Sequence, residues 1–146
     1  MFVRYVVLND VESSTRFRMI RLEGIDHVAL TVLDVGRSIA WYQTVLGLER
    51  RYADVWGDFP AVLGVGSTSL ALFPAPVPDP APPPGREVLS VRHIAFRVDR
   101  AAFEQARVEL EKHGLAPTFE DHTAAHSLYF TDPDGHQLEI TTYDLA

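Results

Sequence analysis

The sequence contains no cysteine, and its 13 lysines and arginines are outnumbered by 20 acidic residues, which gives a formal net charge of -7. The lack of cysteine excludes a disulfide scaffold, a thiol nucleophile, a cysteine-ligated zinc site and an iron–sulfur cluster. The few basic residues form no block, which argues against a nucleic-acid partner. Any bound metal must therefore be held by histidine and carboxylate side chains.

Long apolar runs are also missing. No stretch approaches the roughly 20 apolar residues that a membrane-spanning helix needs. The first residues, which include Arg4, Asn9 and Glu12, lack the apolar core of a signal peptide. We therefore expect a cytoplasmic protein with no membrane partner. A length of 146 residues and a hydrophobic content of 47% fit one globular domain, or two small modules that share a core.

Proline is concentrated in one place, because seven of the ten prolines lie between Pro74 and Pro84. Proline fixes φ and lacks an amide N–H, so this stretch is expected to be an extended surface connector rather than a helix or central strand. A ligand for SH3 domains is the less favoured interpretation, since flanking basic residues are missing. The predicted organisation is an N-terminal extension over 1–21, a first module over 22–73, a linker over 74–86 and a second module over 87–146.

The two modules resemble each other. The run Gly24–Val32 matches the run Ser90–Val98, with a histidine at the same step and an aspartate soon after each run. Both runs alternate and are rich in β-branched residues, as strands are. Each is followed by a helical pattern and then by three short strand patterns. The repeat predicts an α+β fold with the order strand-helix-strand-strand-strand, twice.

Local signals set the expected bounds of these elements. Asp34 and Asp99 are placed to cap the two helices, and Gly47 and Gly114 to end them. Asp132-Pro-Asp-Gly135 suits a type I turn and is interpreted as structural. The neighbouring His136, like His113, is expected to be exposed to water. The strands expected after the helices are Leu48–Val55, Phe59–Val65 and Thr68–Phe73, then Leu115–Glu120, Ser127–Thr131 and Gln137–Tyr143.

Three residues are candidate metal ligands. Side chains alternate between the faces of a strand, so His27 and His93 should point away from the apolar, helix-covered face of their sheets, and Glu139 should do the same. Two imidazoles and one carboxylate hold a divalent metal while leaving positions for water, substrate or O₂. Any one of these residues alone is more simply a half-buried histidine or a solvated carboxylate. Their placement at matching steps of a repeat favours the metal site.

These motifs carry a resemblance to a known family. His27-Val-Ala-Leu-Thr-Val32, His93-Ile-Ala-Phe-Arg-Val98 and Ser127-Leu-Tyr-Phe-Thr-Asp-Pro-Asp-Gly-His-Gln-Leu-Glu-Ile140 resemble the vicinal oxygen chelate superfamily, over residues 22–144. That superfamily includes glyoxalase I, extradiol ring-cleaving dioxygenases, methylmalonyl-CoA epimerase, fosfomycin-modifying enzymes and bleomycin-binding proteins. The resemblance implies two βαβββ modules, curled into an open mixed-sheet barrel around a divalent metal. It also implies a homodimer, with sites that two subunits can share.

One position narrows the choice within the superfamily. Ala71 aligns with Glu139, at the place where glyoxalase I carries a carboxylate ligand and the epimerase an amide or acid. Alanine neither ligates nor accepts a proton, which argues against both mechanisms. The resemblance leaves the three-ligand branches, which are the iron(II) extradiol dioxygenases and the manganese fosfomycin thiol transferases. Ala29, where the transferases usually carry threonine, and a tail without lysine or arginine count against the transferases.

Further candidates surround the predicted site. Tyr129 resembles the tyrosine that hydrogen-bonds a metal-bound substrate oxygen in both branches, with a packing role as the alternative. His122 and His126 lie where ring-cleaving enzymes carry an acid/base histidine, although exposed loop histidines are the simpler interpretation. Arg97 would hold an anionic substrate group or pair with an acid. The candidate aromatic walls of the substrate site, which core packing would explain equally well, are Trp56, Phe59 and Tyr143.

The favoured prediction is an extradiol-type dioxygenase that chelates vicinal oxygens of a small substrate. Fe²⁺ is the favoured metal, with Mn²⁺, Zn²⁺ and Ni²⁺ as alternatives. The second hypothesis is a metal-dependent lyase, isomerase or antibiotic-modifying thiol transferase that uses the same three ligands. The third is a metal-free protein that sequesters a ligand, as bleomycin-resistance proteins do. The presence of the three candidate ligands disfavours this last hypothesis.

Overall fold

The computed structural model describes residues 20–146, so the predicted N-terminal extension lies almost wholly outside the described part of the chain. The first module comprises β1 (His27–Val32), α1 (Val35–Leu46), β2 (Glu49–Arg51), α2 (Ala53–Trp56), β3 (Ala61–Val65) and β4 (Thr68–Pro74). The second comprises β5 (Ile94–Arg97), α3 (Arg100–Lys112), β6 (Thr118–Asp121), β7 (His126–Thr131) and β8 (Gln137–Thr142). Apart from the short α2, the two modules repeat the same order of elements.

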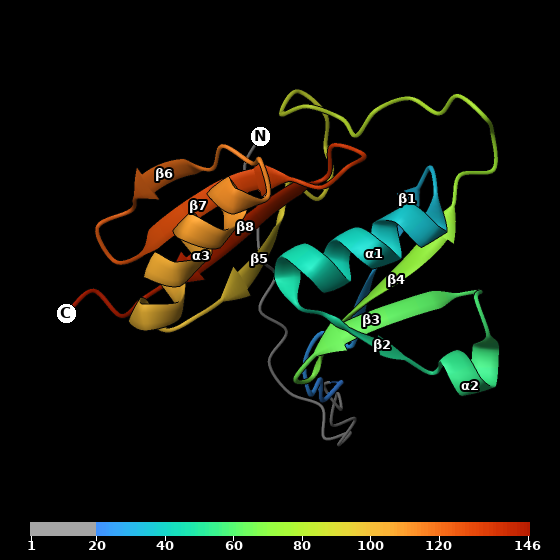
Figure 1. The fold of residues 1–146 in the computed structure, drawn as a ribbon, viewed down its shortest axis with the longest axis horizontal. Coiled ribbons are helices and arrows are strands. Elements are labelled where there is room, and N and C mark those ends of the chain that lie inside the picture. The colour runs from blue at the N-terminus through green and yellow to red at the C-terminus, as the bar shows by residue number, and fades with distance from the viewer. Residues whose placement is uncertain (1–19) are drawn as a thin grey trace, which may run out of the picture.

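Each module forms one four-stranded mixed sheet. The strand orders are β1-β4-β3-β2 and β5-β8-β7-β6, with the first two strands of each order parallel and the other pairs antiparallel. Figure 1 shows α1 over the first sheet and α3 over the second, with the proline-rich segment arching from β4 toward β5. The predicted α+β fold of two modules is confirmed. Within residues 20–146 both sheets remain open, and neither closes into a barrel.

The helix ends follow the local signals. The Asp34 side chain accepts a hydrogen bond from the amide of Arg37 at 2.8 Å, and Asp99 accepts one from the amide of Ala102 at 2.8 Å. Each bond satisfies an amide of the first turn that has no partner within its helix. Gly47, at the end of α1, has φ of 65°, a left-handed conformation that glycine adopts without steric cost.

Several strand predictions were too long. The strand expected over Phe59–Val65 begins at Ala61, directly after Pro60. The strand expected over Leu48–Val55 ends at Arg51, because Tyr52 has φ of 58° and the next residues turn into α2. A left-handed residue cannot continue an extended strand. The strand expected from Leu115 begins only at Thr118, directly after Pro117, which has no amide to offer a neighbouring strand.

The core is continuous between the modules. Leu63, Leu70 and Leu72 of the first sheet belong to the same buried cluster as Leu128 and Leu138 of the second. The ring of Trp41 on α1 lies 6.5 Å from the ring of Phe130 on β7. The linker therefore divides the chain but not the core. In the part of the chain that the structure describes, no helix is long and apolar enough to cross a membrane.

A polar network in the turn between β7 and β8 also joins the modules. Buried Asp132 accepts hydrogen bonds from the Tyr42 hydroxyl of α1 and from Nδ1 of His136, each at 2.8 Å. Asp134 pairs with Arg37 of α1 and accepts a bond from the amide of Leu33 at 2.9 Å. His136, expected to be exposed, is instead largely buried beside this carboxylate, because the turn folds back onto the first module.

Candidate metal centre

Each sheet has a face turned away from its helix, which we call the open face. In β1, Leu30 and Val32 belong to the core, so His27 lies on the opposite side of the strand. In the second sheet, Ile94 and Phe96 pack toward the core, which leaves Ala95 on the open face. The register pairs Ala95 with Glu139. The predicted facing of all three candidate ligands agrees with this pattern.

Two of the three candidate ligands are in contact. His93 immediately precedes β5, and its Nε2 lies 2.9 Å from Oε2 of Glu139. Glu139 is only 6% exposed. Its other oxygen, Oε1, accepts a hydrogen bond from the hydroxyl of Ser127 at 2.5 Å. A buried carboxylate is costly unless its oxygens have partners, and here both oxygens have one.

The third candidate ligand stands apart in the single chain. The side chain of His27 is 51% exposed, and its Nδ1 lies 2.8 Å from the carboxylate of Asp26. Among residues 20–146, no group of three or more histidine and acidic side chains is close enough to hold a metal ion. One chain therefore brings together His93 and Glu139, but not His27.

Tyr129 and His122 lie beside the His93–Glu139 pair. Tyr129 is opposite Glu139 in the register of β7 and β8, and its ring centroid is 5.6 Å from that of His93. Its hydroxyl is 3.0 Å from Nε2 of His122, which is also 3.6 Å from the carboxylate of Glu120. Burial and the negative charge of Glu139 raise the pKa of Tyr129 above its ordinary value. The tyrosine is therefore held protonated, as a hydrogen-bond donor.

His122 and His126 were expected in one loop, but only His122 lies in the connection after β6, because His126 is the first residue of β7. His122 follows β6 in a tight connection, in which its amide bonds the carbonyl of Ala125 at 2.9 Å, and its ring faces Tyr129. His126 is three residues before Tyr129 in β7, so its side chain lies on the opposite face of the sheet. It packs against Phe119, with ring centroids 5.3 Å apart. His126 is thus directed toward the α3 side, away from the other candidate residues.

The first module lacks the polar residues of the second. Ala29 pairs with Ala71 in the parallel register of β1 and β4, as Ala95 pairs with Glu139 in β5 and β8. The alignment of Ala71 with Glu139 is therefore correct in three dimensions. A carboxylate ligand is missing at that position in the first module.

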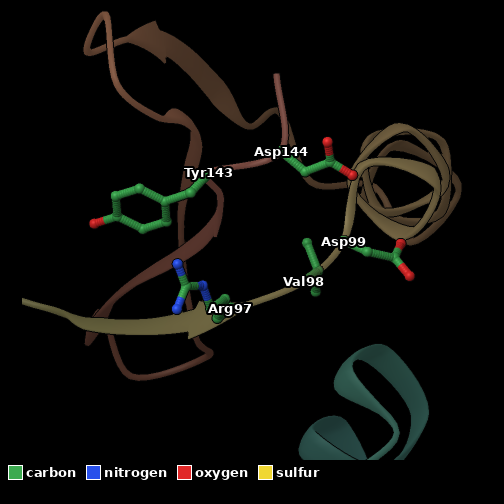
Figure 2. Close-up of a pocket in the computed structure, with 5 residues that line it drawn as sticks. All are labelled: Arg97, Val98, Asp99, Tyr143 and Asp144. Carbon is green, nitrogen blue, oxygen red and sulfur yellow. The ribbon is translucent and has the colours of Figure 1, made fainter. Parts of the chain in front are cut away.

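The remaining candidates lie toward the strand ends. Arg97, at the end of β5, stacks over the ring of Tyr143 at 4.6 Å, and Figure 2 shows both side chains at an open pocket of about 550 Å³. Trp56, on α2, contacts Tyr52 with ring centroids 5.0 Å apart. Phe59 packs edge-on against Phe73 at 5.5 Å. The three candidate wall residues, Trp56, Phe59 and Tyr143, are each roughly half exposed, so none is a core residue.

Sequence reasoning missed two residues of this site. Ser127 holds Glu139, and Glu120 lies next to His122. Both could have been found from strand alternation, since Ser127 is two residues before Tyr129 and Glu120 is two before His122.

The donor set suits a divalent first-row metal. Imidazole nitrogen and carboxylate oxygen bind such ions at about 2.1 Å, so two adjacent donors lie roughly 3 Å apart. The 2.9 Å between His93 and Glu139 matches that spacing. These two residues fit as ligands, and a third donor must be brought to them from outside the pair.

Comparisons with known proteins agree with this geometry. A model of the Glyoxalase/Bleomycin resistance protein/Dioxygenase superfamily matches residues 24–140. Metallothiol transferase FosB of Staphylococcus epidermidis is 31% identical over 128 residues, which cover 85% of this chain and 86% of that protein. Catechol-2,3-dioxygenase of Bacillus subtilis is 30% identical over 122 residues, which cover 80% of this chain and 40% of that protein.

A solved structure extends the match to three dimensions. The glyoxalase/dioxygenase from Nostoc punctiforme is 26% identical, covers 93% of this chain and 98% of its own, and has a TM-score of 0.72. The region that the family model matches contains both repeated strands, His27, His93 and Glu139. The chain therefore belongs to the Glyoxalase/Bleomycin resistance protein/Dioxygenase superfamily.

Proposed function

We propose that this chain is a divalent-metal enzyme of the extradiol-dioxygenase type, which binds a small substrate through two vicinal oxygens. The observation that carries the proposal is the 2.9 Å contact between His93 and Glu139, with Tyr129 and His122 beside it. Superfamily membership supports metal-dependent chemistry in general. The specific reaction class, ring cleavage, is proposed in addition, and it rests on the arrangement of side chains around Glu139.

The third ligand, in this proposal, is His27 of a second copy. His27 lies on an open face, is exposed, and has no candidate ligand near it except Asp26 within the described residues. A second copy that lays its first sheet against the open face of the second sheet would bring His27 toward His93 and Glu139. The protein would then be a homodimer with two shared sites.

Each residue near the pair has a chemical role. The bound metal ion would act as a Lewis acid on the substrate oxygens. The protonated hydroxyl of Tyr129 donates a hydrogen bond to an oxygen on which negative charge develops. Nε2 of His122 takes up the proton released by a substrate hydroxyl, and Glu120, 3.6 Å away, stabilises the resulting imidazolium. Ser127 keeps the carboxylate of Glu139 oriented.

The contact between His122 and Tyr129 favours ring cleavage over thiol transfer. Ring cleavage needs an acid/base group beside the metal, and His122 is hydrogen-bonded at 3.0 Å to the tyrosine opposite Glu139. Transfer of a thiol to an antibiotic is the second candidate. It is supported by the match to metallothiol transferase FosB, which covers most of both chains. A metal-free binding protein is the third candidate, and the paired His93 and Glu139 count against it.

Metal content and two parallel assays test the proposal. Protein purified without a tag is analysed for metal, then loaded with Fe²⁺ and given catechol under O₂, or loaded with Mn²⁺ and given fosfomycin with a thiol. Iron-dependent O₂ uptake with a ring-opened product, lost in Glu139→Gln, is the expected result. A manganese-dependent conjugate would establish the transferase instead. Absence of any metal stoichiometry, with ligand binding unchanged by chelators, would overturn both in favour of the binding protein.

A further inference from the structure

A cation lies on the open face of the first sheet without an acidic partner. Nη1 of Arg51 donates a hydrogen bond to the hydroxyl of Ser69 at 2.9 Å, and Nη2 donates one to the carbonyl of Gly66 at 2.7 Å. Both acceptors are neutral. Of the ion pairs formed among residues 20–146, none includes Arg51. Since a guanidinium has five N–H donors, several remain for a ligand.

The position of Arg51 depends on a glycine. The guanidinium lies over Gly64 of β3, where an added Cβ would come within 2.4 Å of the Arg51 Cζ. Gly64 pairs with Ser69 of β4 in the sheet register. The glycine therefore leaves the space that lets the arginine side chain lie flat on the sheet and reach Ser69.

The same face carries His27. Ser69, which accepts the bond from Arg51, pairs with His27 in the parallel register of β1 and β4. The guanidinium is above β3, two strands from β1, so about 10 Å separates it from the start of β1. A ring that carries a short anionic side chain spans that distance. A molecule bound near His27 therefore has this guanidinium within reach.

Comparison of the two sheets shows that they have diverged in charge. By register, Ala71 and Val62 of the first sheet occupy the positions of Glu139 and Tyr129 in the second. Two residues before Val62, Pro60 is the counterpart of Ser127, which lies two residues before Tyr129. The carboxylate of Glu139 and the hydroxyls of Ser127 and Tyr129 have no counterpart in the first module, whereas His93 has one in His27. The same register places Arg51 where the second sheet has Thr118. The open face of the second sheet thus carries His93 and Glu139, and that of the first carries His27 and the cation of Arg51.

We infer that Arg51 binds an oxyanion, a carboxylate or phosphate-like group, and that this is the anionic end of the substrate. The identification of this anion as part of the substrate rests on the proposed function, because it makes the ligand of Arg51 the molecule held at the metal. A half-buried guanidinium that has only neutral acceptors gains most from an anion, which it can bind through two parallel N–H bonds. Arg51 then selects anionic substrates over neutral ones of the same shape.

Metal-free full-length protein tests the anion site separately from the metal site. Binding of inorganic phosphate and, in a second arm, acetate is followed by calorimetry in wild type, Arg51→Gln, Arg51→Lys and Arg50→Gln. The last is the charge-matched control, because Arg50 donates to the backbone carbonyls of Val62 and Gly57. We expect anion affinity to fall about tenfold or more in Arg51→Gln, to recover partly in Arg51→Lys, and to stay near wild type in Arg50→Gln.

The variant Gly64→Ala tests whether the position of the Arg51 guanidinium, and not only the net charge of the protein, sets the anion affinity. Its methyl group would displace the guanidinium while the net charge stays the same, and a flexible side-chain end can move without unfolding the sheet. The proposal expects this variant to lose anion affinity as Arg51→Gln does, with an unchanged circular dichroism spectrum. Wild-type affinity in Arg51→Gln, or equal losses in Arg51→Gln and Arg50→Gln, would overturn it. Metal loading of the same variants reports on the proposed function independently.

Discussion

The hydroxyl of Tyr42 donates a hydrogen bond of 2.8 Å to the carboxylate of Asp132, although the two residues are 90 positions apart in the sequence. The tyrosine belongs to α1 of the first module and the aspartate to the turn between β7 and β8 of the second. Burial, followed by the charge of Asp132, raises the pKa of the Tyr42 hydroxyl, so it remains a donor. This bond links the two modules, together with the pair of Arg37 and Asp134 and the shared apolar core.

Removal of that hydroxyl should weaken the whole fold. Tyr42→Phe keeps the buried ring but deletes a bond to a charged acceptor, which typically costs about 1.5–3 kcal/mol. We expect the free energy of unfolding in urea to fall by that amount. Tyr143→Phe is the matched control, since Tyr143 is 58% exposed and should change stability little. Equal stability of Tyr42→Phe and wild type would show that this hydrogen bond contributes nothing to holding the modules together.

The same network should make stability depend on pH. The hydrogen bond that His136 donates to the carboxylate of Asp132 raises the pKa of His136 above 6.5, against the opposing effect of burial. Burial tends to raise the pKa of Asp132, but its bonds from His136 and Tyr42 outweigh this and lower it below 3.8. The groups that face His136 in this network are Asp132 and Asp134, with Tyr42 and Arg37 behind them.

The directions of these two pKa shifts define the pH range in which the network stabilises the fold. Because the pKa of His136 is raised in the folded protein, this histidine stabilises the fold fully below pH 6.5. Its contribution is lost as the pH rises through its pKa in the folded protein. Because the pKa of Asp132 is lowered in the folded protein, this carboxylate stabilises the fold above pH 3.8. Its contribution is lost as the pH falls through its pKa in the folded protein. The stability gap between wild type and His136→Gln, measured by urea unfolding, should be largest near pH 5.5 and narrow by pH 9. A gap that widens with pH would contradict the assignment.

Removal of the candidate carboxylate ligand should abolish metal binding without unfolding the protein. Glu139→Ala deletes a side chain whose contacts are with His93 and Ser127, while Leu138 and Ile140 keep the apolar face of β8 intact. We expect metal stoichiometry near zero with an unchanged circular dichroism spectrum. Loss of secondary structure in this variant would assign Glu139 a structural role instead.

Mixing of two inactive variants tests whether copies share a site. His27→Ala and Glu139→Ala should each lose metal as pure homodimers. When the two are unfolded and refolded together, mixed dimers regain one intact site if His27 of one copy completes the pair of the other. Recovery of up to about one quarter of wild-type metal content is the arithmetic limit for random pairing. No recovery, in a mixture shown to contain mixed dimers, would place all ligands in one chain.

His122 and His126 should differ in their effects on activity. His122→Phe removes the partner of the Tyr129 hydroxyl, so kcat should fall by roughly 10²–10⁴, the usual contribution of a general acid or base. His126→Phe changes a ring that packs against Phe119, so it should alter stability more than kcat. Rates are to be measured with the substrate established by the catechol or fosfomycin assay. The reverse order of effects would assign the proton transfer to His126.

Superfamily membership, the repeated order of elements and the facing of the ligands could all be predicted from the sequence. Helix caps at Asp34 and Asp99 depend on bonds to residues three positions away, so they are visible as local signals. The exit of the strand into α2 at Tyr52 was not predicted, because a left-handed tyrosine is rare. The burial of His136 was predicted wrongly, since only the packing of its turn onto α1 removes it from water.

The sequence by itself determined the two modules and which side chains share each sheet face, because strand alternation and helix capping depend on near neighbours along the chain. Only the tertiary structure decided which of those side chains meet. The contact of His93 with Glu139 and the position of Arg51 above Gly64 follow from strand register, and the contact of His122 with Tyr129 follows from the connection between β6 and β7. Register depends on turns and packing between residues far apart in the sequence, and a shift of one residue would reverse every facing.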